Sequence, residues 1–267
     1  MTRIHALVLS VALLSAVAAV KPQPVMANDL QESRQLVERA RMTFENFTAD
    51  KEMGGSLRSL VKKAKAVLIY PQVLRGAFIV GASGGSGVLL ARDPASGNWS
   101  GPAFYTIGEA SFGLQAGGEA SEVVLVALTE RGLTALLSTS AKLGANASVA
   151  VGPVGAGAEA ATANLSADLV SYTRNKGLYG GVSLEGAVVA KRDALNMAYY
   201  NRPVSPTDIL IKHTVTNQES TGLISAVAKV AGGAPAAQRP STGGGSEVAA
   251  LEFVPADVFS DERPGRS

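Results

Sequence analysis

A tract of small side chains, GASGGSG at residues 81–87, constrains the fold of this chain more than any other feature of its sequence. Apolar, strand-like sequence precedes the tract over 66–70 and 77–80 and follows it over 87–91. A backbone that carries so few side chains either turns tightly or lies directly against another part of the molecule. Together with 29 glycines and a charged fraction of only 17%, the tract favours a strand-and-turn protein over a helical bundle.

The net charge argues against nucleic acid as a partner. The formal charge of +2 includes the first 27 residues, which contain two basic residues, Arg3 and Lys21, and no acidic residue. Subtracting these two from the 24 basic residues leaves 22, which equals the number of acidic residues. A neutral remainder lacks the basic excess that binding to a phosphate backbone requires.

The first 27 residues have the pattern of an export signal. Arg3 precedes an apolar run from Ala6 to Val20, and Val25-Met26-Ala27 is a small-residue cleavage pattern. The run is shorter than the ~20 residues of a bilayer-spanning helix. We therefore expect a cleaved signal peptide and a periplasmic or secreted protein, and retention of the signal as an N-terminal anchor is the alternative. The absence of cysteine excludes a disulfide framework and a lipid-modified N-terminal cysteine.

The hydrophobic pattern changes along the chain from helical to strand-like. Val37, Ala40 and Phe44 recur at three- and four-residue spacings and predict a helix over 29–47. Ser56 is the expected cap of a second, short helix. Beyond that helix, the sequence predicts strands over 66–70, 77–80, 87–91, 103–107, 111–116, 123–128, 147–151, 169–174 and 178–190.

The later part of the chain predicts one domain and a tail. Thr129 and Asp193 are expected to cap two further helices, and residues 208–210 are expected to be extended. The compact domain should then span 28–211. The remainder, 212–267, combines an apolar segment at helical spacing with a Gly/Pro-rich linker and a charged end.

One motif suggests a hydrolase. Gly81-Ala82-Ser83-Gly84-Gly85 matches G-x-S-x-G, in which the serine lies on a turn between a strand and a helix. Here, however, strand-like sequence follows the motif. A triad would need His213, the one histidine beyond the export signal, together with Asp193 or Asp208. Nothing in the sequence suggests that these side chains meet, so a lipid-ester hydrolase acting through Ser83 is only a third alternative.

The sequence contains no pattern for a metal or a cofactor. Zinc sites of the usual kind need cysteine or several histidines, and the chain has no cysteine and two histidines. No phosphate-binding G-x-x-x-x-G-K-[S/T] loop and no D-x-D-x-D-G calcium loop is present. We therefore expect a protein without a cofactor or a metal.

Several ordered blocks of sequence resemble the SYLF domain, a lipid-binding family. The blocks cover 63–69, 76–81, 84–92, 98–104, 122–128, 143–155, 171–186, 199–200 and 208–210. They occur in the order found in the family and extend over roughly 30–211. The resemblance implies an α+β fold with a large, curved, mostly antiparallel β-sheet, barrel-like at its core, and flanking short helices. It also implies that Gly84, Gly85 and Gly87 form a tight turn between strands.

The resemblance implies a function at membranes. Eukaryotic members bind phosphoinositides and membranes with the help of a basic amphipathic helix, and exported bacterial members resemble lipid-binding proteins of the cell envelope. The helix over 29–47 departs from the basic pattern, because it has three basic and four acidic residues. The better basic feature lies around the second helix and consists of Arg58, Lys62, Lys63, Lys65 and Arg75. Each could contribute ~1 kcal/mol against an anionic surface, and a solvated helix face is the alternative interpretation.

The expected function is therefore non-enzymatic binding of phospholipids at the bacterial cell envelope, with anionic, phosphoinositide-like lipids as possible ligands. Membrane phospholipids are the expected partner, and nucleic acid is not. The alternative is an envelope scaffold that binds another protein through the tail, residues 212–267. The sequence does not indicate the preferred headgroup or the oligomeric state.

Overall fold

The computed structural model describes residues 25–77, 80–112, 117–153, 166–175, 178–180 and 184–232, and these residues belong to one compact unit. Residues 1–24 of the expected export signal lie outside them, as do Gly177 at the expected hairpin turn and the tail beyond residue 232. The residues of the expected cleavage pattern, Val25-Met26-Ala27, are described and form the start of the first helix.

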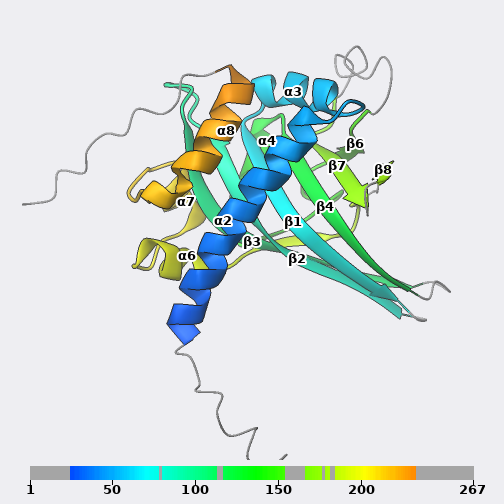
Figure 1. Ribbon diagram of the computed structural model, residues 1–267, viewed down its shortest axis with the longest axis horizontal. Coiled ribbons are helices and arrows are strands. Elements are labelled where there is room, and N and C mark those ends of the chain that lie inside the picture. Colours follow the sequence, from blue (N-terminus) through cyan, green and yellow to red (C-terminus); the bar gives the residue numbers. More distant parts are fainter. Residues whose placement is uncertain are drawn as a thin grey trace, which may run out of the picture. The chain divides into compact units, whose positions relative to one another are not determined.

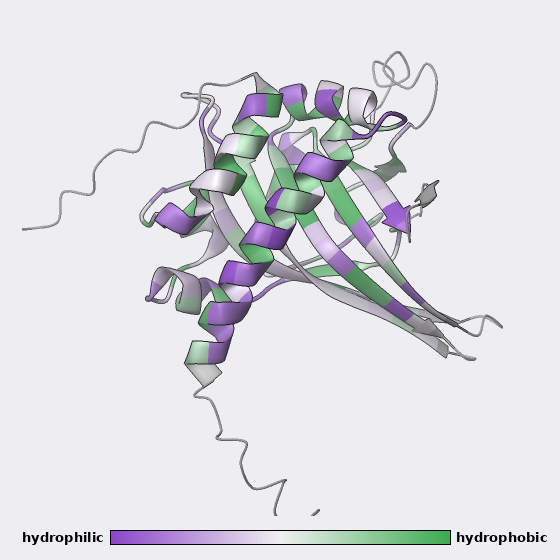
Figure 2. Ribbon diagram, viewed as in Figure 1, coloured by the Kyte–Doolittle hydropathy of each residue, from purple (hydrophilic) through white to green (hydrophobic). Residues whose placement is uncertain are grey.

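The predicted N-terminal helix is confirmed and is longer than expected. It is α2 (Val25–Ala49), which crosses one face of the sheet (Figure 1). Its apolar stripe, which includes Leu36, Ala40 and Phe44, is buried, while the outward side is hydrophilic (Figure 2). Because one side of α2 packs against the sheet, apolar residues recur in its sequence every three or four positions. We call this side of the sheet the α2 face and the other side the opposite face.

The second helix forms, but Ser56 does not cap it. Helix α3 (Gly54–Lys63) begins after Met53, which makes no side-chain capping bond. The Ser56 hydroxyl lies inside the first turn and donates to the carbonyls of Met53 and Pro153, at 2.9 and 2.8 Å. It is buried because Tyr172, from a distant strand, donates its own hydroxyl to the same oxygen at 3.0 Å. A tertiary contact thus uses the hydroxyl that the sequence pattern assigned to a local cap.

Within the described residues the sheet has nine strands and is curled into a half-barrel. The strands are β1 (Ala66–Ala77), β2 (Val80–Arg92), β3 (Trp99–Phe112), β4 (Gly117–Ala127), β5 (Ser140–Lys142), β6 (Val149–Val151), β7 (Leu169–Asn175), β8 (Leu178–Gly180) and β9 (Val188–Lys191). Their order is β5-β9-β3-β2-β1-β4-β7-β6, with β8 paired to β7, and only the β6–β7 pair is parallel. The expected α+β fold with a curved, mostly antiparallel sheet and flanking short helices is confirmed.

The expected glycine turn is wrong, because residues 81–87 lie inside β2. The sequence predicted several short strands in this region, whereas the structure has long ones. Gly84, Gly85 and Gly87 therefore lie within β2, between the paired strands β1 and β3. An added Cβ on Gly85 would lie 2.2 Å from the carbonyl oxygen of Gln72. On Gly87 it would lie 2.4 Å from the ring of Tyr70. These two glycines permit β2 to approach β1 closely, and they do not form a turn.

An irregularity in β1 explains the close approach. The register of β1 against β2 shifts between Ile69 and Gln72. Pro71 lies within this shift, and proline has no N–H to donate to a ladder. The bulge brings the backbone of β1 toward β2 beside Gly85, where a side chain would not fit.

Short helices complete the unit. Helix α4 (Glu130–Leu137) is capped by Thr129 as predicted, since its hydroxyl accepts from Gly132 N–H. Helix α6 (Asp193–Tyr200) begins directly after Arg192, one residue from the expected cap position. The expected extended segment at 208–210 is wrong. It belongs to helix α7 (Pro206–Leu210), because Ser205 and Asp208 form a reciprocal capping box.

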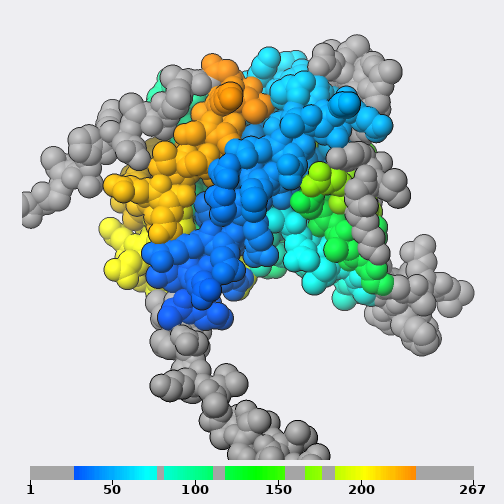
Figure 3. All heavy atoms as spheres, in the orientation of Figure 1, coloured from blue at the N-terminus to red at the C-terminus, as the bar shows by residue number. Residues whose placement is uncertain are grey.

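The compact unit continues past the expected boundary at Ile211. A 3₁₀ turn (Gln218–Ser220) leads into α8 (Thr221–Ala231), which lies beside α2 (Figure 3). Leu223 and Val227 of α8 are buried in the same core as the sheet. The predicted domain end is therefore too early by one helix.

Candidate functional site

Lys62 and Lys63 are the exposed part of the predicted basic group. Both lie in the last turn of α3, and among the described residues neither forms an ion pair. Arg92 joins them from the end of β2, because its guanidinium donates to the carbonyl of Lys62 at 3.1 Å and to that of Gly97 at 3.2 Å. We call Lys62, Lys63 and Arg92 the α3 cluster.

Arg58 has a structural role. Its guanidinium donates to the carbonyl of Thr48, in the last turn of α2. The last carbonyls of a helix have no partner within it and carry a partial negative charge, so a cation here stabilises the helix end. Arg58 is exposed and remains near the α3 cluster. Like Arg92, it keeps its charge while its guanidinium donates to a backbone carbonyl.

Lys65 and Arg75 are not part of one basic surface. Lys65 pairs with Glu130 at 2.6 Å, and Arg75 pairs with Glu109 at 3.1 Å. They lie ten residues apart along β1, which corresponds to about 33 Å at ~3.3 Å per residue. The structure therefore brings together three of the five predicted residues at α3, leaves Lys65 neutralised beside them, and places Arg75 elsewhere.

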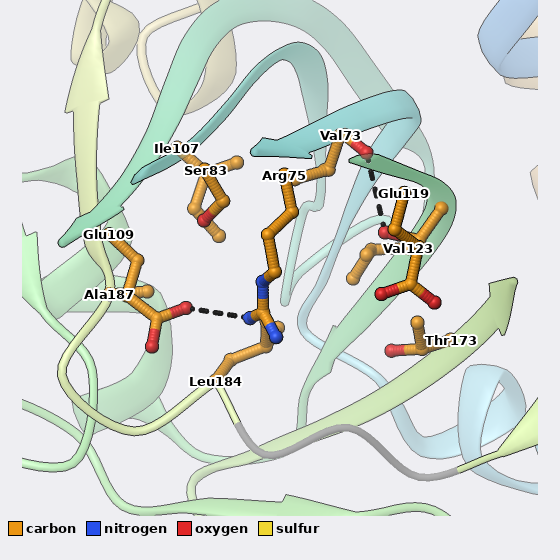
Figure 4. A pocket seen from close by; sticks show the side chains of 11 residues that line it. Val73, Arg75, Ser83, Ile107, Glu109, Glu119, Val123, Thr173, Leu184 and Ala187 are labelled. Carbon is orange, nitrogen blue, oxygen red and sulfur yellow. Dashed lines mark hydrogen bonds and ion pairs between the residues drawn. The ribbon is translucent and has the colours of Figure 1, made fainter. Parts of the chain in front are cut away.

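Arg75 lies in a small hollow on the opposite face of the sheet (Figure 4). The ladder places Glu109, Ser83, Arg75 and Glu119 in one row across β3, β2, β1 and β4. Thr173 of β7 and Leu184 close the hollow from the other side. Two carboxylates against one guanidinium give the row a formal charge of −1, so it does not attract anionic lipid.

A Ser83-based triad is wrong for the described residues. Ser83 lines the hollow on the opposite face, and no histidine is among the residues that line it. His213 instead lies 3.6 Å from Asp93, the residue that follows β2. Ser83 and Asp93 are ten residues apart along that strand, or about 33 Å. The G-x-S-x-G match therefore lies within a strand and meets no base.

A second hollow separates α2 from the sheet on the α2 face. Its volume is about 150 Å³, and Leu36, Arg39, Gln72 and Leu74 are among the residues that line it. Leu74 is 55% exposed, the largest value among the exposed large apolar side chains of the described residues. We call this hollow the Leu74 groove. No sequence pattern predicts this groove, because it forms only when α2 and the β1–β2 pair are packed together.

The Asp168 carboxylate accepts several hydrogen bonds and has a structural role. Thr129 donates to Asp168 at 2.6 Å, and the backbone and hydroxyl of Ser148 donate at 2.9 and 2.8 Å. These bonds, that from Thr129 first, hold the pKa of Asp168 below its ordinary value. Asp168 joins the cap of α4 to β6 and β7 and lies far from any group that could use it as a base. Burial raises the pKa of Tyr105 and of Tyr199 well above the ordinary value of a tyrosine, so neither transfers protons near neutral pH.

Neither a cluster of metal-ligating side chains nor a helix able to cross a membrane is found among the described residues. Within them, no group of three or more His, Asp or Glu side chains is placed to hold a metal ion. None of the described helices is both long and apolar enough to cross a bilayer.

Comparison with known proteins identifies relatives. The model of the Ysc84 family, described as Las17-binding protein actin regulator, matches residues 108–230. "SH3 domain-containing YSC84-like protein 1" of Homo sapiens is 36% identical over 157 residues, which cover 58% of this chain and 45% of that protein. Its counterpart in Xenopus laevis is 32% identical over 185 residues, 67% of this chain and 53% of the relative. "Protein YSC84" of Saccharomyces cerevisiae is 34% identical over 146 residues, 53% of this chain and 31% of the relative.

The chain spans about half the length, or less, of these curated relatives. The names of the Homo sapiens and Xenopus laevis relatives describe SH3 domain-containing proteins, and the family model is described as an actin regulator. Neither wording describes an enzyme. The family match extends to residue 230, nearly to the end of α8, in agreement with the packing of that helix.

Proposed function

This chain carries a domain of the Ysc84/SYLF family, and on that premise we propose that it is a non-enzymatic protein that binds anionic phospholipid surfaces through the α3 cluster. The observation that carries the proposal is the exposure of Lys62 and Lys63 beside Arg92 at one end of the sheet. Three cations at ~1 kcal/mol each supply about 3 kcal/mol near an anionic surface. That free energy corresponds to roughly 150-fold in affinity.

Of the basic residues that the sequence suggested, Lys62 and Lys63 belong to the α3 cluster, whereas Lys65 and Arg75 do not. Lys65 and Arg75 are held by Glu130 and Glu109, so they should contribute little to attraction. The three cations of the cluster are exposed or half-exposed, and salt should therefore screen them strongly. Polyanionic headgroups, such as those of phosphoinositides, should bind more tightly than singly charged ones.

Co-sedimentation with vesicles tests the proposal. The chain from residue 28 should sediment with vesicles that contain 30% phosphatidylglycerol in phosphatidylcholine and not with pure phosphatidylcholine. Raising the salt from 50 to 500 mM should release it. The double variant Lys62→Gln, Lys63→Gln should bind about 30-fold more weakly, from about 2 kcal/mol of lost attraction. The matched control is Lys142→Gln, Arg202→Gln, which removes the same charge from exposed positions on other elements.

Equal weakening by the two double variants would assign the effect to net charge and reject the α3 cluster. Binding to neutral and anionic vesicles alike would reject the electrostatic basis of the proposal.

We infer further that the protein acts at a bacterial cell envelope after export, in the periplasm or outside the cell. The support is the pattern of residues 1–27, in which an apolar run precedes Val25-Met26-Ala27. N-terminal sequencing of the protein from an expressing bacterium should begin at Asn28. An intact Met1 on a membrane-bound protein would instead establish the alternative, an N-terminal anchor.

A second candidate function is protein binding, favoured by the family description and by the Leu74 groove. The Ysc84 family model is described as Las17-binding, and the groove presents an exposed leucine beside a hollow of about 150 Å³. A scaffold that acts through the tail cannot use the apolar side of α8, because that side is buried in the core. It would have to use residues beyond 232.

Two changes separate these possibilities. Truncation after Gly232 leaves α8 in place, whereas a cut at residue 211 would remove it and expose the core. Lipid binding through the α3 cluster should survive both the truncation and Leu74→Asp. Loss of lipid binding in either variant, with the fold intact by circular dichroism, would reject the α3 cluster as the sole site.

A further inference from the structure

The hollow on the opposite face contains a buried hydroxyl that has no partner. Thr173 is 3% exposed, and its Oγ1 forms no hydrogen bond within the described residues. A buried hydroxyl without a partner destabilises the folded protein, because it loses its hydrogen bonds to water and gains none in return. Thr173 is one of the residues that line the hollow. A buried hydroxyl without a partner in the wall of a hollow indicates that the hollow can receive a polar group.

The chemistry of the lining selects a donor that carries positive charge. Glu109 is already paired with Arg75, whereas among the described residues Glu119 forms no ion pair. Figure 4 shows the Glu119 carboxylate directed toward Thr173. A carboxylate can only accept hydrogen bonds, and the net charge of −1 disfavours an anion.

The size of the hollow limits the group to one heavy atom with its hydrogens. Its volume is about 20 Å³, close to what a single water needs. An –NH₃⁺ group is about as large as water and has three donors, whereas a trimethylammonium group is much larger and has none. Solvent reaches the hollow, since the side chains of Arg75 and Glu109 remain 36% and 20% exposed.

From these three observations we propose that the hollow binds the primary ammonium group of a small amine. The Glu119 carboxylate neutralises the ammonium and accepts one of its protons, and the Thr173 hydroxyl accepts a second. Val73 and Ile107 contact the carbon atom that bears the nitrogen. This site is on the other face of the sheet from α2 and does not depend on the α3 cluster or on lipid binding through it.

Nuclear magnetic resonance of the ¹³C,¹⁵N-labelled protein tests the proposal directly. Methylammonium chloride, added up to 100 mM at constant ionic strength, should shift the Thr173 methyl signal in a saturable way. Tetramethylammonium chloride, which has the same charge and no donor, should not. Ethanolamine and nanodiscs that contain phosphatidylethanolamine show whether the amine is free or part of a headgroup, and a saturable shift with either source supports the site. A response that is equal for methylammonium and tetramethylammonium, or absent for every amine, would overturn the proposal.

Two substitutions assign the binding to the named atoms. Glu119→Gln keeps the shape of the side chain and removes its charge, and it should weaken methylammonium binding at least tenfold. Thr173→Val removes the hydroxyl at nearly constant volume and should weaken binding about fivefold without lowering the Tm. Glu52→Gln, an exposed carboxylate before α3, is the control and should leave binding unchanged. Unchanged affinity in both test variants would overturn the assignment even if the amine does bind the protein.

Discussion

The adjacent glycines of β2 should respond to the same substitution with opposite signs. A Cβ on Gly85 would lie 2.2 Å from the carbonyl oxygen of Gln72 and 3.1 Å from the Cα of Val73. Both atoms belong to the backbone of β1, which cannot rotate away as a side chain can. On Gly84 the nearest atom is the carbonyl oxygen of Ile107 at 3.6 Å, which is ordinary contact.

These distances set the expected magnitudes. Replacing glycine by alanine where there is room restricts the unfolded chain and stabilises the folded protein by about 0.4–1 kcal/mol. Gly84→Ala should therefore raise the free energy of unfolding slightly. Gly85→Ala must displace β1 from β2, and overpacking of this kind typically costs about 1–3 kcal/mol. At about 2–4 °C per kcal/mol for a unit of this size, the two variants should differ in Tm by roughly 3–15 °C.

Urea denaturation monitored by the fluorescence of Trp99, which is 4% exposed, is a suitable assay. The denaturation midpoint should rise slightly for Gly84→Ala and fall for Gly85→Ala, with equal m-values. Gly76→Ala, where nothing lies within 4 Å of the added Cβ, is a second tolerant control. Equal effects at Gly84 and Gly85, or a more stable Gly85→Ala protein, would refute the close approach of β1 and β2.

Three further predictions follow from the same contacts. Hydrogen bonds, that from Thr129 first, lower the pKa of Asp168, so its stabilising effect should be complete above the unfolded value of about 3.9 and lost as pH falls through the folded value; urea titrations from pH 6 to pH 2 should show less acid sensitivity in Asp168→Asn. Leu223→Ala should cost about 2–5 kcal/mol because Leu223 is 1% exposed, and an unchanged denaturation midpoint would contradict the packing of α8. Arg58→Ala should lower stability by about 0.5–1 kcal/mol through loss of the cation at the end of α2, whereas Arg58→Lys should restore part of it.

Local patterns were enough to predict much of the fold. The three- and four-residue spacing in 29–47 predicted α2, and the serine-or-threonine rule predicted the cap of α4 at Thr129. Strand-like sequence over 169–174 predicted β7 within one residue. Each of these elements is specified by residues close together in the chain, because one face of a helix or one cap depends on neighbours within a few positions.

The basic cluster required the tertiary structure. In the sequence, Lys65 and Arg75 are basic residues near the second helix, just as Lys62 is. In the structure, however, acidic residues from α4 and β3 neutralise Lys65 and Arg75. Arg92 is 30 residues from Lys62 and reaches it only because β1 and β2 pair. No spacing rule connects residues whose proximity is set by strand register.

For the glycines of β2 as well, the sequence determined one part of their role and the tertiary structure the other. The sequence by itself determined that residues 81–87 have backbone that can approach another part of the molecule closely, and the order of its blocks indicated a resemblance to the SYLF family. Only the tertiary structure decided that Gly85 faces a bulge in β1, while Gly84, one position earlier, leaves room for a methyl group. The reason is physical: a small side chain permits close approach in any direction, and only the partner strand decides where that approach occurs.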